Sequence, residues 1–259
     1  MTVVSAGNAA SLSAARHPLP RFSVGVGDRF AHQAEAQLAA FERLAAEGVV
    51  VAPVWNKSNR EHSFIGSEPA SVWQAAAAAV TERHWPHPWF VDADHIRIST
   101  VERFLESSNF FTIDVADSIG QPAPAAAVAA FIARHGELSA PVAIPGIATP
   151  LPLSPQSLEA IVTYYLLACR EAGAVYRHIR ARTPAAGFVT EVSMDETDRP
   201  QTPPELLVIL ALLADEQIPL ETIAPKFTGR FNKGVDYCGD LAQFEQEFSD
   251  DIAVLAFAA

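Results

Sequence analysis

The sequence predicts an α/β fold of the (β/α)8 TIM-barrel type, with about six of the eight strand–helix units present. Two observations support this prediction. Short runs of β-branched and aromatic residues alternate with longer helical patterns, and these runs are apolar on both faces, as in a parallel sheet covered by helices. Polar residues follow the end of every run, which is where parallel α/β folds bind their ligands.

Six segments are predicted to be strands, and they span residues 22–27, 49–55, 88–95, 110–116, 187–193 and 222–227. The segments predicted to be helices span residues 32–48, 70–84, 99–108, 154–182, 202–217 and 240–259. Thr202, two prolines and Glu205 have the order of a capping box with proline in the first turn, so we expect a helix to begin there.

In the last predicted helix the apolar residues are spaced for one face, and they are Leu241, Phe244, Phe248 and Ile252. We expect residues 1–20 to form a loose N-terminal tail and residues 21–259 to form the barrel domain. About seventy residues separate the fourth and fifth strands, which predicts an elaborated insertion at about 117–186. The chain ends where a seventh strand would begin. We therefore expect an incomplete barrel with an exposed sheet edge, which favours aggregation or marginal stability.

Composition restricts the partners of the chain. With 18 Lys and Arg against 30 Asp and Glu, the formal net charge is −12, and this charge repels nucleic acids and anionic membranes. No apolar run reaches the roughly 18 residues of a membrane span. Only two cysteines occur, and no signal-peptide pattern opens the sequence, so we predict free thiols and a cytoplasmic location. The sequence does not indicate an oligomeric state.

The segment WFVDADHI, residues 89–96, ends an apolar strand with two carboxylates and an imidazole. Asp92 and Asp94 fall on one face of the strand because side chains alternate with a period of two. They could be a helix-capping or ion-paired group. The functional interpretation is a general base beside a metal ligand, His95, since a carboxylate and a neutral imidazole suit Mn, Zn, Fe or Ni.

Other strand ends carry further candidates. Glu191 follows the fifth strand and could act as a second acid or base, because burial raises the pKa of a glutamate towards the working range. Its alternative role is an ion pair with Lys226 or Arg60. Cations among glycines after the sixth strand suit an anionic substrate, or form a solvated turn. The candidate substrate-binding residues are Lys57, Asn59, Arg60, Lys226, Arg230 and Lys233.

From residue 21 to the end, the chain resembles the tagaturonate epimerase family, through the motifs SVGVGDRFAHQ, PVWNKSNREH, VDADHI, FFTIDVADSIG, TEVSMDE and APKFTGRFNKGVDY in this order. The resemblance implies a (β/α)8 barrel, a divalent metal, and interconversion of tagaturonate and fructuronate in hexuronate catabolism. It also implies that Asp94 is the proton acceptor, His95 a metal ligand and Glu191 the proton donor. Family members continue into a further segment with histidine-bearing motifs, which this sequence does not contain.

The two sugar acids differ at the carbon β to the ketone, whose C–H bond the carbonyl does not acidify. A retro-aldol route avoids this problem, provided that a metal stabilises the resulting enediolate: a base takes the β-hydroxyl proton, the bond between the α and β carbons breaks, and the aldehyde adds back on its other face. The expected partner is thus a small keto-sugar acid. Two alternatives remain: an aldolase that releases the two fragments of a related keto-sugar acid, and an inactive truncated remnant that only binds an anionic sugar.

Overall fold

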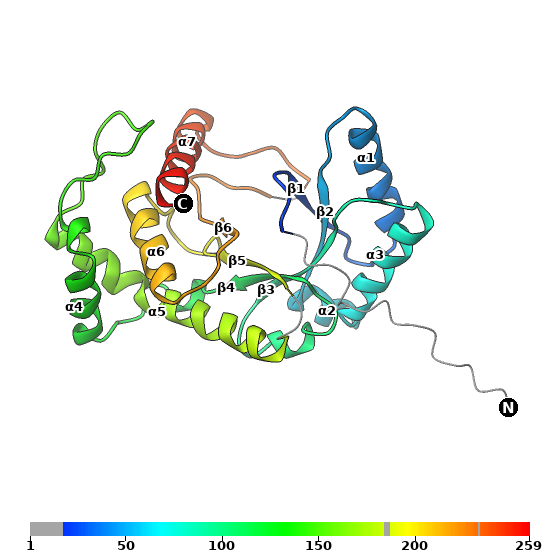
Figure 1. Ribbon diagram of the computed structural model, residues 1–259, viewed down its shortest axis with the longest axis horizontal. Coiled ribbons are helices and arrows are strands. Elements are labelled where there is room, and N and C mark those ends of the chain that lie inside the picture. Colours follow the sequence, from blue (N-terminus) through cyan, green and yellow to red (C-terminus); the bar gives the residue numbers. More distant parts are fainter. Residues whose placement is uncertain (1–17, 184–186, 233) are drawn as a thin grey trace. The chain divides into compact units, whose positions relative to one another are not determined.

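The computed structural model describes residues 18–183, 187–232 and 234–259 (Figure 1). Its six strands pair in the order in which they occur in the chain. They are β1 (Ser23–Gly27), β2 (Ala52–Ser58), β3 (Phe90–Ile96), β4 (Phe110–Asp114), β5 (Val189–Ser193) and β6 (Thr222–Ala224). The pairs β1–β2, β2–β3 and β3–β4 are parallel. The predicted α/β fold, with its strands in TIM-barrel order, is confirmed, and each predicted strand is present with shifted ends.

The chain divides into two compact units, Met1–Ile113 with Val175–Glu191 and Asp114–Ala174 with Val192–Ala259. In the first unit, α1 (Ala34–Ala46) and α3 (Ala70–Glu82) lie side by side next to β2 (Figure 1). Leu38 of α1 and Ala76 of α3 are fully buried with Trp55 and Val91 of the strands. Full burial of a leucine side chain stabilises the fold by about 1.5–3 kcal/mol, so this cluster fixes the helices to one face of the strands.

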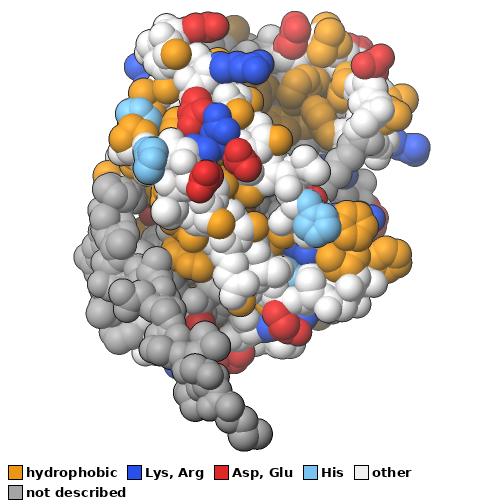
Figure 2. All heavy atoms as spheres, turned by 90° about the vertical axis from the view of Figure 1, so that its right-hand side faces the viewer, with side chains coloured by type: hydrophobic (Ala, Val, Ile, Leu, Met, Phe, Trp, Pro, Cys, Tyr) orange, Lys and Arg blue, Asp and Glu red, His pale blue; other side chains and the backbone are white. Residues whose placement is uncertain are grey.

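The outward face of the first unit carries a cluster of ion pairs between α1 and the end of α3. Basic and acidic side chains stand next to one another on this face in Figure 2. Arg83, which follows α3, pairs with Glu35 at 3.3 Å and with Glu42 at 2.5 Å, both from α1. These ion pairs connect α1 to the end of α3.

The second unit is mainly helical. It contains α4 (Ala125–Arg134), α6 (Pro203–Asp215), α7 (Leu241–Ala258) and most of α5 (Pro155–Arg182), with the 3-10 turns η2 (Ala116–Ser118) and η3 (Gly136–Ser139). The predicted capping box is present: Glu205 accepts hydrogen bonds from the backbone N–H and the hydroxyl of Thr202, both at 2.8 Å. In the part of the chain that the structure describes, no helix is long and apolar enough to cross a membrane.

Three local expectations were wrong or incomplete. The helix expected at 99–108 is only the 3-10 turn η1 (Val101–Arg103), because Thr100 bonds back to Arg97 and a short polar segment leads straight into β4. One helix was not expected: α2 (Asn59–Ile65), which begins directly at the end of β2. Residues 1–17 of the expected tail lie outside the described residues, while Leu19 packs against an apolar cluster of β2, β3, β4 and β5.

The expected buried face of α7 is also wrong. Leu241, Phe248 and Ile252 are 56%, 50% and 50% exposed. The buried residues of this helix are instead Asp251 and Val254. Helical spacing locates an apolar face but does not show that a neighbouring element covers it.

Candidate active site

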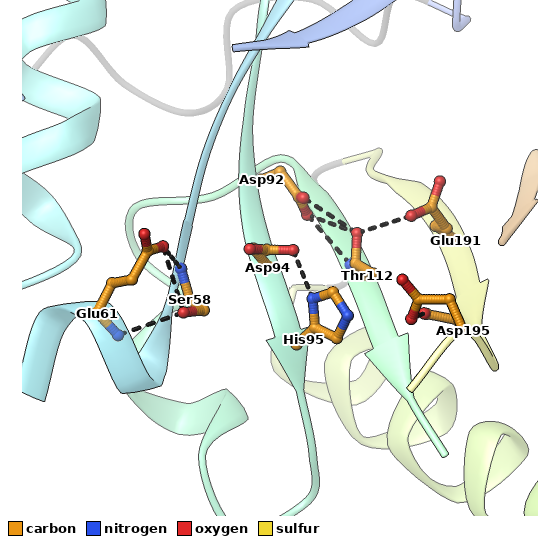
Figure 3. Close-up of polar contacts among 9 residues, drawn as sticks. Ser58, Glu61, Asp92, Asp94, His95, Thr112, Glu191 and Asp195 are labelled. Atoms are coloured by element: carbon orange, nitrogen blue, oxygen red, sulfur yellow. Dashed lines mark hydrogen bonds and ion pairs between the residues drawn. The ribbon is translucent and has the colours of Figure 1, made fainter. Parts of the chain in front are cut away.

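Polar side chains replace apolar ones towards the carboxyl ends of the strands in the first unit. Phe90, Phe110 and Val189 belong to one buried apolar cluster on β3, β4 and β5. Two residues further along each strand, on the same face, are Asp92, Thr112 and Glu191. Figure 3 shows these three side chains side by side. The layer is polar because it lies where the strands end and a ligand can enter.

Asp92 is the most deeply buried carboxyl group of this layer, with 6% of the residue exposed. Its Oδ1 accepts the backbone N–H of Thr112 at 3.1 Å, and its Oδ2 lies 3.0 Å from the Thr112 hydroxyl. Burial raises the pKa of Asp92 well above its ordinary value, and the negative charges of Asp94 and Glu191 raise it further, while the hydrogen bonds of Thr112 oppose the shift. Asp92 therefore favours its protonated form.

Asp94 and His95 lie at an irregularity of β3. The pairing with β4 shifts register between Ala93 and Ile96, so β3 carries an extra residue there. His95 has a left-handed backbone with φ of 51°, which is unusual for a residue other than glycine. Its Nδ1 lies 2.7 Å from Asp94 Oδ1, and the two side chains are 24% and 19% exposed. The bulge turns the imidazole back onto the carboxylate (Figure 3).

The junction of β2 and α2 is a capping box beside this layer. Ser58 is the N-cap of α2: its hydroxyl accepts the backbone N–H of Glu61 at 3.2 Å, and Glu61 accepts the backbone N–H of Ser58 at the same distance. Ser58 is also the register partner of Asp94 in the β2–β3 pair. Neighbouring parallel residues point to the same face, so the cap of α2 lies on the face that carries the carboxylates.

Lys57 lies on the opposite face of β2. It alternates with Asn56 and Ser58, and only 1% of it is exposed. Its ammonium donates to Ser67 Oγ at 2.9 Å, and the same oxygen lies 2.9 Å from His62 Nδ1. Burial lowers the pKa of Lys57, and burial together with the charge of Lys57 lowers the pKa of His62 to about 4. The structure thus places Lys57 in a buried network beneath α2, away from Asp92 and Asp94.

The remaining predicted substrate ligands have partners of their own within each unit. Asn59 Oδ1 accepts a hydrogen bond from Arg103 at 2.9 Å, and Arg60 is exposed in the first turn of α2. Lys226 and Arg230 belong to the second unit, where the backbone of Lys226 bonds twice to Gln201 and the backbone of Arg230 pairs with Cys238. Lys233 lies outside the described residues. Their roles in substrate binding stay predictions.

The residues present do not by themselves fit a catalytic metal. Within residues 18–183, 187–232 and 234–259, no group of three or more His, Cys, Asp or Glu side chains could hold a metal ion. Catalytic zinc sites use about three protein ligands. His95 has one property of a metal-binding histidine, since a neutral ring that donates Nδ1–H to Asp94 carries its lone pair on Nε2. The metal dependence therefore stays a prediction.

The contacts of Thr112 with Asp92 and Glu191 were not predicted from the sequence. Thr112 was treated as an ordinary strand residue, and Asp92 was considered only together with Asp94. The period of two contained the missing signal: Asp92, Thr112 and Glu191 each stand two residues after a buried apolar residue of a strand. The same alternation separates Lys57 from this layer.

Strand–helix units in sequential order, with acid and base side chains at the carboxyl ends of the strands, define an α/β protein of the TIM-barrel type. The sequence model of the tagaturonate epimerase family, UxaE, matches residues 12–256. The chain belongs to this family, which confirms the resemblance seen in the motifs.

Individual epimerases are also similar to this chain in sequence and in structure. The chain is 26% identical over 239 residues to the tagaturonate/fructuronate epimerase of Thermotoga maritima, covering 88% of this chain and 48% of that protein. A glycerol-complexed crystal structure of the fructuronate-tagaturonate epimerase UxaE from Cohnella laeviribosi superposes with a TM-score of 0.79 at 22% identity, covering 92% of this chain and 50% of that chain. The native structure of the same enzyme gives a TM-score of 0.76 at 23% identity. The chain spans about half the length of these relatives.

Proposed function

We propose that this chain carries the proton-transfer residues of an epimerase that interconverts tagaturonate and fructuronate. Membership of the tagaturonate epimerase family supports the substrate class. The observation that carries the proposal is the pair of carboxyl groups on one polar face, with Asp94 held against His95 and Glu191 held by Thr112. Two carboxyl groups in different environments suit the separate tasks of a base and an acid.

In this proposal Asp94 accepts the β-hydroxyl proton, which allows the bond between the α and β carbons to break, and returns it to the β-oxygen when that bond forms again. Glu191 donates a proton to the fragment that carries the former ketone and takes it back when the aldehyde adds on its other face. His95 orients Asp94 through the 2.7 Å contact between Nδ1 and Oδ1. No step is assigned to a metal, because the described residues do not form a complete ligand set.

Heavy water tests the route. The hydrogen on the β carbon stays with the aldehyde fragment throughout a retro-aldol and aldol sequence, so fructuronate formed from tagaturonate should contain no deuterium at the inverted carbon. Nuclear magnetic resonance of the product measures this directly. Deuterium at that carbon would contradict the retro-aldol route, and accumulation of free fragments would instead support the aldolase alternative.

Asp94→Asn tests the assignment of the base. Removing the proton acceptor should abolish turnover, a loss of at least about 100-fold for general-base catalysis. Asp250→Asn is the matched control, because it changes an aspartate of α7 that is not part of the polar layer, and it should keep full activity. Full activity in Asp94→Asn, or no conversion of either sugar acid by the folded wild-type chain, would contradict the proposal.

A further inference from the structure

The hydroxyl of Thr112 lies between two carboxyl groups. Thr112 Oγ1 is 3.1 Å and 3.0 Å from the two carboxyl oxygens of Asp92, and it is 3.2 Å from Oε1 of Glu191. Figure 3 shows the three side chains in a line that crosses β3, β4 and β5. Thr112 is 2% exposed, so the protein supplies the surroundings of this hydroxyl.

Counting hydrogens shows that the two carboxyl groups cannot both accept a hydrogen bond from the hydroxyl of Thr112. A threonine hydroxyl has one hydrogen to donate and can accept further bonds on its oxygen. It can therefore donate to Asp92 or to Glu191, but not to both. The other carboxyl group must itself be protonated and donate to Thr112 Oγ1, because an unprotonated one would face the lone pairs of the hydroxyl.

Burial decides which group holds the proton. Asp92 is 6% exposed, whereas Glu191 is half-buried and retains more contact with solvent. The charged groups that act most strongly on Asp92 are Asp94 on its own strand and Glu191 on β5, and both are acidic. Oδ1 of Asp92 already accepts the backbone N–H of Thr112, so the proton belongs on Oδ2, 3.0 Å from the hydroxyl.

We propose that Asp92 stores a proton for Glu191 and that Thr112 is the relay between them. In the transfer, the O–H bond of Asp92 breaks, its proton moves to Thr112 Oγ1, and the hydroxyl hydrogen of Thr112 moves to Glu191 Oε1. Asp92 is then ionised and accepts both the hydroxyl and the backbone N–H of Thr112. The inference deepens the proposed function and rests on it for the catalytic use of Glu191, which must be protonated before it can act as the acid.

Infrared spectroscopy of the isolated chain tests the stored proton. A protonated carboxyl group has a C=O stretch distinct from the carboxylate bands, and we expect such a band at neutral pH. The measurement uses the Asp251→Asn background, because Asp251 is another buried aspartate whose pKa is raised to about 7. In that background the band should shift when aspartate is labelled with ¹³C and disappear when Asp92→Asn is added. Asparagine has the shape of the protonated acid, so these variants should fold. Absence of the band in Asp251→Asn, or its persistence after Asp92→Asn is added, would overturn the proposal.

The relay is tested with Thr112→Val and with Thr112→Ser, which keeps the hydroxyl. In wild type and Thr112→Ser, ¹³C resonances of Asp92 and Glu191 should titrate as a coupled pair. In Thr112→Val only the repulsion between the two charges should remain, so the coupling should be weaker than in Thr112→Ser. Equal coupling in folded Thr112→Val and Thr112→Ser would overturn the relay. If Thr112→Val does not fold, Thr112→Ala gives the same comparison with Thr112→Ser.

These measurements need no turnover, so they separate the relay from the proposed function. A chain with the infrared band and coupled titrations that converts no sugar acid would contradict the function alone. An active chain in which Thr112→Val and Thr112→Ser have the same pH profile of kcat would contradict the relay alone.

Discussion

Asp251 is a carboxylate buried in α7 without a complete set of partners. It is 4% exposed, and its Oδ1 has no hydrogen-bond partner among the residues that the structure describes. Burial raises the pKa of Asp251 to about 7, and the charges of Glu247 and Asp250 contribute to the shift. The folded chain therefore holds a proton that the unfolded chain releases above its ordinary pKa of 3.8.

The sign of the pH dependence follows from this difference. At pH values below 3.8, Asp251 is protonated in both the folded and the unfolded chain and does not lower the free energy of unfolding. As the pH rises from 3.8 to about 7, the free energy of unfolding falls. Above that pH the loss stays constant. Asp251→Asn should therefore raise the free energy of unfolding at pH 8 more than at pH 4, by up to about 4 kcal/mol. Urea unfolding at the two pH values measures the effect, and Asp236→Asn, at an exposed position outside α7, should show no such difference.

At the residue scale, the sequence identified groups but not their connections. Asp94, His95 and Glu191 were recognisable because polar residues at strand ends are costly without a function or a partner. Thr112 gave no such signal, since threonine is common in strands. Lys57 was grouped with the substrate ligands by its place in the chain, although its side chain lies on the other face of β2.

At the element scale, the capping box at Ser58 holds the start of α2. Ser58→Ala removes the acceptor for the backbone N–H of Glu61 and should lower the free energy of unfolding by about 0.5–2 kcal/mol. Chemical denaturation monitored by circular dichroism measures the loss. Ser63→Ala is the control in the same helix, because Ser63 is exposed and does not cap it. Equal losses in both variants would contradict the role of the cap.

The exposed apolar face of α7 should promote self-association. Leu241 and Ile252 are each half exposed or more and lie three turns apart on this helix. We expect the double variant Leu241→Lys and Ile252→Lys to reduce the concentration-dependent increase of mass in analytical ultracentrifugation. Leu44→Lys, at a 40% exposed position in α1, should leave that increase unchanged. A wild-type chain that stays monomeric at high concentration would contradict the prediction that this face promotes self-association.

Elements were predictable where periodicity extended over several turns, as in α1, α3, α5, α6 and α7. The helix α2 was missed because it has 7 residues and begins without a turn after β2. The segment at 99–108 showed the reverse error: its local pattern is helical, but Thr100 and the polar residues before β4 stop it after one 3-10 turn.

At the scale of the whole molecule, the alternation of strands and helices was enough to predict the strand order, because consecutive parallel strands joined by helices are usually neighbours. The division into two compact units was not visible in composition or periodicity. The predicted cytoplasmic location has no counterpart in the described contacts, and it stays a prediction.

The acidic composition gives a prediction for the whole chain. The sequence pI is about 5.0, so the net charge that keeps molecules apart vanishes as the pH falls to that value. Light scattering at constant ionic strength should show least solubility near pH 5. As the pH falls from about 7 to 5, Asp251 becomes protonated and the free energy of unfolding rises. We therefore expect the chain to precipitate without unfolding. Precipitation that is instead coupled to loss of circular dichroism would contradict this separation.

The left-handed backbone of His95 restricts which substitutions can accumulate at this position during evolution. Among residues other than glycine, Asn, Asp and His tolerate this conformation best, whereas β-branched residues are strained in it. A saturation library at position 95 that is selected only for a folded chain should therefore retain Gly, Asn, Asp and His and lose Val and Ile. The end of β3 would keep ligand-type residues even in descendants without any turnover. Persistence of a histidine there among distant copies of the gene is, for this reason, weak proof that they remain catalysts.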